Sequence, residues 1–146
     1  MSAYVPNLIV AALILPAVLG SLILLLLRHR LGASRLVSLG SCLALVAIAA
    51  SLTVHASSGA VESYALGNWR APFGIVLVLD RLSAMMLLLT SVLALAVMSY
   101  AVVTGTDRKG WHFHPLFQFQ LLGLNGAFLT GDLFNLFVFF EVLLIA

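Results

Sequence analysis

Charged side chains are scarce in this chain of 146 residues: Asp, Glu, Lys and Arg together make up 8% of it, whereas 63% is hydrophobic. Soluble globular domains carry about one quarter charged residues, so this chain could not cover a water-facing surface. Its seven Lys and Arg residues lie in short segments between apolar runs instead of on one face, which argues against nucleic-acid binding. We therefore predict a protein whose solvent is lipid.

Cysteine is almost absent as well. Cys42 stands alone inside an apolar run, so no disulfide framework can form, and we interpret it as a small core residue. The sequence also lacks a glycine-rich phosphate loop, a nucleophile–base pair, a redox cofactor motif and a metal-ligand spacing. We predict no enzyme activity, no cofactor and no metal.

Long apolar runs take the place of these motifs. A membrane-spanning helix needs about 20 apolar residues, and by this measure we predict an all-α integral membrane protein, a multi-helix bundle with four full spans and a shorter fifth. The predicted spans are Asn7–Leu27, Leu36–His55, Leu82–Thr104, Pro115–Thr130 and the segment from Leu133 to Ala146. The fifth covers about 21 Å of a hydrocarbon core about 30 Å thick, so we expect the sequence to be part of a longer protein.

The connection between the second and third spans has a different composition. Val61–Leu66 and Ile75–Leu79 are rich in strand-forming residues and are separated by Gly, Asn and Pro, which predicts a short β-hairpin. We therefore divide the chain into residues 1–56 with the first two spans, residues 57–81 with the hairpin, and residues 82–146 with the third to fifth spans.

The basic residues predict the orientation of the chain. Five of them fall on one side of the predicted spans and two on the other. The five are Arg28, Arg30, Arg35, Arg108 and Lys109, and the two are Arg70 and Arg81. Because inner loops carry the excess of Lys and Arg, we predict that the N-terminus and the hairpin lie outside, with Trp69 and Trp111 at opposite membrane interfaces.

Glu141 is the sharpest exception to the apolar pattern. It follows Asp132, the predicted outer start of the fifth span, by nine residues and therefore lies about 13.5 Å deep. An ionised carboxylate at that depth costs about 3 kcal/mol or more, so it must be protonated or paired with a cation from another helix. Its helical neighbours at three- and four-residue spacings are Phe134, Phe137, Val138, Leu144 and Ile145.

Because no Lys or Arg lies inside a predicted span, the cation must come from outside this sequence. We predict that Glu141 carries protons; the alternative is a structural salt bridge that orders the bundle.

Weaker polar signals lie in the fourth span and beside it. His114, Gln118 and Asn125 share one helical face and could line a hydrated path or hold helices together; we favour the packing role. His112 and His114 could collect protons, although we favour an interfacial role for both. Asp132 is a candidate N-cap, and Asp80 with the adjacent Arg81 could form a local ion pair or a docking contact.

The segment from Gly123 to Val142, which reads GLNGAFLTGDLFNLFVFFEV, strongly resembles the D subunit of Mrp-type multisubunit sodium/proton antiporters. The segment from Gly67 to Ala84 resembles the region before the third helix of the same family. These subunits are in turn similar to the proton-translocating, antiporter-like subunits of NADH–quinone oxidoreductase. In that wider family the glutamate matched by Glu141 pairs with a lysine on a later helix and takes part in proton translocation.

The resemblance implies a long chain of about fourteen helices with two inverted five-helix repeats, of which this sequence resembles only the first helices. It implies partners as well: other subunits of an antiporter complex, H⁺ with Na⁺ or K⁺ as transported ions, and the lipid bilayer. The implied location is the bacterial cytoplasmic membrane.

Three functional hypotheses follow. The first is a subunit of a cation/proton antiporter with Glu141 in the proton path. The second is a membrane-arm subunit of a quinone reductase or a hydrogenase, in which electron transfer drives the protons. The third is a structural subunit that only supports assembly.

Overall fold

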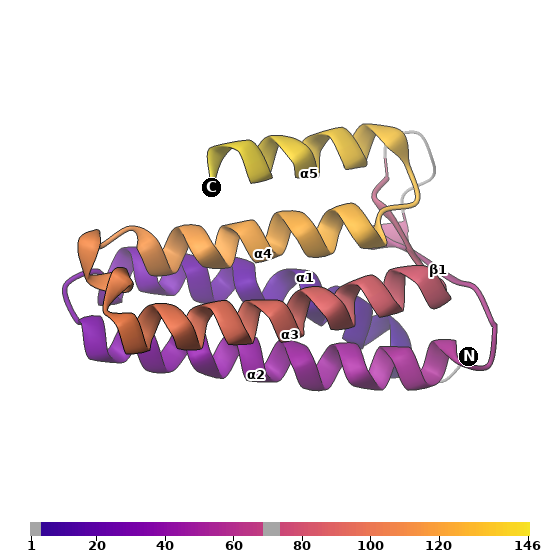
Figure 1. Cartoon of the computed structure of the whole chain (residues 1–146). Helices are drawn as coiled ribbons and strands as arrows, with labels where there is room; N and C mark the ends of the chain where they lie inside the picture. Colours follow the sequence, from indigo (N-terminus) through magenta and orange to yellow (C-terminus); the bar gives the residue numbers. More distant parts are fainter. Residues whose placement is uncertain (1–3, 69–73) are drawn as a thin grey trace.

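The computed structural model describes residues 4–68 and 74–146 of the chain. Its elements are α1 (Tyr4–Leu22), the π-helical turn η1 (Ile23–Leu27), α2 (Leu31–Ala56), β1 (Glu62–Ala65), η2 (Leu66–Asn68), β2 (Val76–Leu79), α3 (Arg81–Thr104), η3 (Thr106–Lys109), α4 (Phe113–Leu129) and α5 (Leu133–Ile145). Helices α1 to α4 lie side by side as an up-and-down bundle, and α5 lies against α4 at its edge (Figure 1). We call the end with residues 27–31 and 105–112 the loop end and the opposite end, with β1 and β2, the strand end.

The predicted helical membrane fold is confirmed in its general form. Three helices among the described residues are long and apolar enough to cross a membrane: Tyr4–Leu27, Leu31–Ala56 and Arg81–Thr104. Helix α4, predicted as a full span, has 17 residues and a length of about 25 Å, and α5 has 13 residues. The total number of spans, the division into three parts and the orientation remain predictions.

Small residues allow the bundle helices to approach closely. On both α2 and α3 the buried positions recur every three or four residues, the spacing of a helix seam that packs against a neighbour at a shallow angle. This row consists of Ser34, Ser38, Ser41, Leu45, Ala49, Leu52 and Ala56 on α2, and Ala84, Leu87, Ser91, Ala94, Met98 and Ala101 on α3, with Cys42 and Ser83 buried beside it. Because lipid tails are as apolar as leucine, such close van der Waals packing is what holds membrane helices together.

The two strands pair in antiparallel fashion, with Glu62 opposite Leu79 and Ala65 opposite Val76. Both lie within the segments predicted as strands. The turn between α4 and α5 is attached to β2, because the Gly131 N–H donates to the Val76 carbonyl at 2.8 Å. A side chain at Gly131 would not fit there, since its Cβ would lie 2.5 Å from Val78 Cγ2. Arg70, used to predict the orientation, and Trp69, predicted at a membrane interface, lie outside the described residues.

Two carboxylates begin helices at the strand end. Asp132 accepts from the Phe134 N–H at 2.7 Å and caps α5, which confirms the predicted N-cap. Asp80 accepts from the Ser83 N–H at 2.7 Å and caps α3, and the Ser83 bonds lower the pKa of Asp80. Of the two roles considered for Asp80 and Arg81, the local ion pair is absent from the described residues, since the Arg81 guanidinium donates to the Ser57 carbonyl instead; the docking contact stays a prediction.

Candidate functional site

Helix α5 packs on a face of α4 that carries two glycines. A Cβ at Gly126 would overlap the ring of Phe139, and a Cβ at Gly123 would lie 2.8 Å from Leu143 Cγ. The Phe139 ring therefore occupies the space that a side chain on α4 would take. Because α5 makes its main contact here, this glycine face determines which side of α5 is turned away from the bundle.

Glu141 lies on the side of α5 that the bundle leaves exposed. The five apolar residues that share its helical face are also exposed: Phe134 70%, Phe137 63%, Val138 41%, Leu144 85% and Ile145 80%. Within the described residues, Glu141 has neither a hydrogen bond nor an ion pair. The structure thus shows the apolar surroundings predicted for Glu141, but on a face that this chain does not cover.

The three polar residues predicted on one face of α4 all lie inside the bundle. Ser41 Oγ on α2 donates to Gln118 Oε1 at 2.9 Å, and Asn125 Nδ2 donates to the Ala12 carbonyl on α1 at 2.9 Å. His114, the third, is 2% exposed. These bonds connect three helices as a packing role requires; whether the same residues also line a hydrated path stays a prediction.

An ion pair that was not predicted from the sequence connects α2 to η3 at the loop end. Arg35 Nε and Nη2 donate to Asp107 Oδ2 and Oδ1 at 2.5 and 2.7 Å, a bidentate contact from α2 to η3. The Asp107 side chain has no exposed surface, and the Arg35 side chain is 20% exposed. The Arg35 guanidinium holds the pKa of Asp107 below its ordinary value, and the bond from His114 acts in the same direction against the effect of burial.

The assignment of Arg35 to a loop is corrected by the bounds of α2; that no Lys or Arg lies inside a membrane span stays a prediction. Helix α2 begins at Leu31, five residues before the predicted span, so Arg35 lies one turn inside the helix instead of in a loop. The shortage of acidic residues was the feature of the sequence that could have indicated this ion pair. With five Asp and Glu in the whole chain, an aspartate between two apolar runs is a sign of a buried cationic partner.

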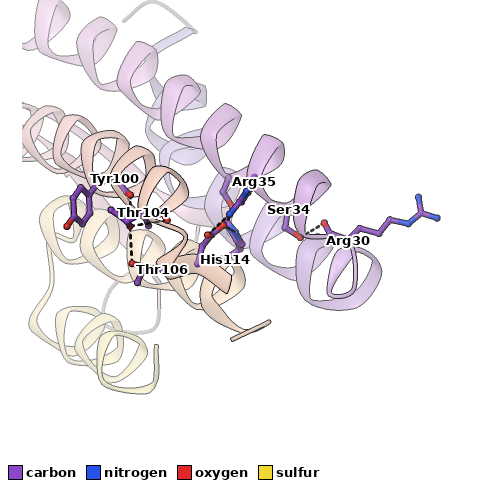
Figure 2. A network of polar contacts seen from close by, with 10 residues as sticks. Arg30, Ser34, Arg35, Tyr100, Thr104, Thr106 and His114 are labelled. Carbon is purple, nitrogen blue, oxygen red and sulfur yellow. Dashed lines mark hydrogen bonds and ion pairs between the residues drawn. The ribbon is translucent and has the colours of Figure 1, made fainter. Parts of the chain in front are cut away.

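His114 joins this ion pair to α2. Its Nε2 lies 3.2 Å from Asp107 Oδ2, and its Nδ1 lies 3.0 Å from Ser38 Oγ. Figure 2 shows Arg35 and His114 approaching each other from neighbouring helices. The His114 side chain is therefore buried in the bundle near its loop end, and the interfacial role predicted for it stays a prediction. His112, predicted alike, is exposed and its ring lies 3.4 Å from that of Trp111, centroid to centroid.

A second histidine–carboxylate contact lies at the strand end. His55 Nε2 on α2 is 2.6 Å from Glu62 Oε1 on β1, and both side chains are partly buried. Among the described residues, no group of three or more His, Cys, Asp and Glu side chains is arranged to hold a metal ion.

Together these features define a class: a multi-pass helical membrane protein with a buried ion-pair cluster at one end of its bundle and a carboxylate on the uncovered face of an edge helix. No family model matches the chain. It is 40% identical to the D subunit of the Na⁺/H⁺ antiporter of Alkalihalophilus pseudofirmus over 141 residues, which are 96% of this chain and 28% of that protein. It is 69% identical over 83 residues to the D subunit of a probable K⁺/H⁺ antiporter of Rhizobium meliloti, 57% of this chain and 15% of that protein.

A solved structure agrees with these relatives. The fold matches a chain of the Mrp complex from Dietzia sp. with a TM-score of 0.85 and 34% sequence identity, covering 98% of this chain and 26% of that one. The chain is thus homologous to the D subunits of the Mrp-type antiporters over nearly its whole length, and it spans between a quarter and a third of the length of the first of these relatives.

Proposed function

We propose that this chain forms part of a D-type subunit of a multisubunit antiporter that exchanges Na⁺ or K⁺ for H⁺ across the bacterial cytoplasmic membrane. Glu141 takes up and releases the proton in this proposal. The relatives support the class of transport, since they are named as subunits of Na⁺/H⁺ and K⁺/H⁺ antiporters. The further partners are the other subunits of the complex and the lipid bilayer.

The position of Glu141 is the observation that carries the proposal. The carboxylate lies on a helix face that is otherwise apolar and exposed. Ionised in lipid, it would cost about 3 kcal/mol or more, so this face requires a covering partner that supplies a counter-charge or keeps the acid protonated. A carboxylate whose charge depends on such a partner can load and release a proton when the partner moves.

The orientation predicted from the basic residues is part of this proposal. With the N-terminus outside, the strand end faces outward and the loop end, with Arg28, Arg30, Arg108 and Lys109, faces the cytoplasm. Protons then enter Glu141 from the outer side and leave inward, while the cation moves out.

The test uses everted membrane vesicles that carry the complete antiporter, with a fluorescent reporter of the pH gradient. We expect Glu141→Ala and Glu141→Gln to abolish the collapse of the gradient on addition of Na⁺ or K⁺, and Glu141→Asp to retain part of it. The substitution Leu144→Ala on the same face is the matched control, because it trims the face but leaves the charge unchanged. Full activity in Glu141→Ala would refute the proposed role.

The amount of assembled complex is measured in the same vesicles. If Glu141→Gln lowers the amount of complex while the rate per complex stays at the wild-type value, Glu141 supports assembly and carries no proton. An antiporter collapses the pH gradient when the cation is added, and this step needs no electron donor. A proton pump driven by electrons would not respond to the cation in this way, so the assay also separates these two functions.

A further inference from the structure

The ion-pair cluster at the loop end has no role in the function proposed above. It lies on a different side of α4 from α5: Gly123, which contacts α5, follows His114 by nine residues, about half a turn around the helix axis. Two buried titratable side chains, Asp107 and His114, are therefore separate from Glu141 and require their own explanation.

A pocket lies beside this cluster at the loop end, although the side chains of Asp107 and His114 are themselves buried. It has a volume of about 340 Å³ and opens at the loop end, with both Asp107 and His114 among its lining residues. The other titratable and charged groups on its walls are Arg28 and His29 from the end of η1 and Arg108 from η3, while Arg35 faces Asp107 from α2. Three of these neighbours are permanent cations, and Asp107 is the one carboxylate among the groups named here.

The bonding of His114 suits a side chain that changes its protonation state. In the neutral form Nε2–H donates to Asp107 and Nδ1 accepts from the Ser38 hydroxyl. When a proton is added at Nδ1, both nitrogens donate, and the Ser38 hydroxyl must accept in place of donating. A serine hydroxyl on a helix can then turn to the carbonyl four residues earlier. Both states can therefore be satisfied by rotation of one hydroxyl group.

A hydrolytic role for this arrangement of serine, histidine and aspartate is excluded by burial. Ser38 has no exposed surface and lies inside the seam of α2, so no substrate could reach its oxygen. Further along the same faces, the Ser41–Gln118 bond continues the polar row, and Gln118 Nε2 is buried without a partner in the described chain. This free donor points to a ligand that the row can hold, and a water molecule is the smallest that fits its chemistry.

We propose that Asp107 and His114 form a second proton-binding site, which is loaded from the loop-end pocket and in which Ser38 and Gln118 extend the hydrogen-bonded row into the bundle. Asp107 stabilises the imidazolium, and Arg35 competes with His114 for the same carboxylate. The proposed purpose of this site, which is to exchange protons with the cytoplasmic side, rests on the function proposed above. Its existence as a proton-binding site is independent of Glu141.

The first test observes His114 directly. Histidine labelled with ¹⁵N in the complete complex gives an imidazole signal that is assigned by its loss in His114→Gln. We expect this signal to change from the charged to the neutral form as the pH is raised from 5 to 9. With Asp107→Asn the midpoint should move toward acid by at least about one pH unit, because the imidazolium loses its carboxylate. With Arg35→Gln it should move the opposite way, because the competing cation is removed.

The second test measures the pH profile of the cation-dependent gradient collapse. We expect His114→Gln to flatten one limb of the profile, whereas His55→Gln, which removes the other histidine–carboxylate contact, leaves both limbs intact. A His114 signal that keeps one protonation state from pH 5 to 9, or a midpoint that is the same with Asp107→Asn, would overturn the proposal. If Glu141→Gln remains active while His114 titrates as described, the transport role of Glu141 fails and the proton-binding site stands.

Discussion

Replacing Gly126 with alanine should separate α5 from α4. The added methyl group would occupy the space of the Phe139 ring, so the ring or the whole of α5 must move. Overpacking of this kind costs about 1–3 kcal/mol, and the higher helix propensity of alanine offsets about 1 kcal/mol of it. We expect Gly126→Ala to lower the free energy of unfolding by up to about 2 kcal/mol.

A second glycine provides the matched control. Gly40 lies on the exposed side of α2, and a Cβ there would meet no atom within 4 Å. Gly40→Ala should therefore show the gain in propensity alone. The difference between the two variants isolates the steric cost and should be about 1–3 kcal/mol. The measurement is the unfolding of the purified protein in mixed micelles as the denaturing detergent is increased.

The cost should depend on the aromatic ring. In a Phe139→Ala background the space beside Gly126 is empty, so adding the methyl group should no longer destabilise the protein. A coupling free energy near zero between the two substitutions would refute the packing argument. So would a Gly126→Ala variant whose stability equals that of Gly40→Ala.

Three further predictions concern stability and burial; the first two use the same unfolding measurement, and the third uses chemical labelling. Asn125→Ala removes the bond to the Ala12 carbonyl and should cost about 0.6 kcal/mol, the average for hydrogen bonds between membrane helices, and at most about 1.7 kcal/mol. No loss would mean that water replaces the amide. Asp107→Asn should lower the free energy of unfolding because it leaves the Arg35 guanidinium without its anion. Since the pKa of Asp107 is lowered in the folded state, its contribution is complete above the unfolded value near 4 and is lost as the pH falls through the folded value; the variant should lose this acid dependence. Cys42, which is fully buried, should react with a maleimide only after unfolding, and labelling of the native protein would contradict its place in the core.

The helices could be predicted from the sequence because hydrophobic length in a membrane is a strong constraint. The third span, predicted over Leu82–Thr104, begins one residue later than α3, whose bounds are Arg81–Thr104. The error at α2 has a specific cause. Arg35 was assigned to a loop because charge is costly in lipid, but its charge is neutralised by Asp107, which lies 72 residues away in the sequence. No local pattern reveals a partner at that distance.

In the candidate site, too, local features could be predicted from the sequence and contacts between distant residues could not. Spacing alone placed His114, Gln118 and Asn125 on one face of a helix, because helical periodicity is local. It could not show that this face is turned toward α1 and α2, since the direction depends on which side of α4 is occupied by α5. The glycines that admit Phe139 decide this, and their meaning appears only when the facing helix is known.

The hydrogen bond from Gly131 to Val76 makes the start of α5 a fixed pivot. Sliding of α5 along α4 would break this bond and the bridge between Leu77 and Thr130, whereas tilting about the turn breaks neither. Glu141 lies about 13.5 Å along the helix from Asp132. A tilt of about 10° would therefore carry its carboxylate sideways by about 2 Å, which is enough to make or break a contact with a cation on a neighbouring helix. The strand pair thus fixes the position of the first residues of α5, while Glu141 lies far enough from them for a small tilt to change its contacts.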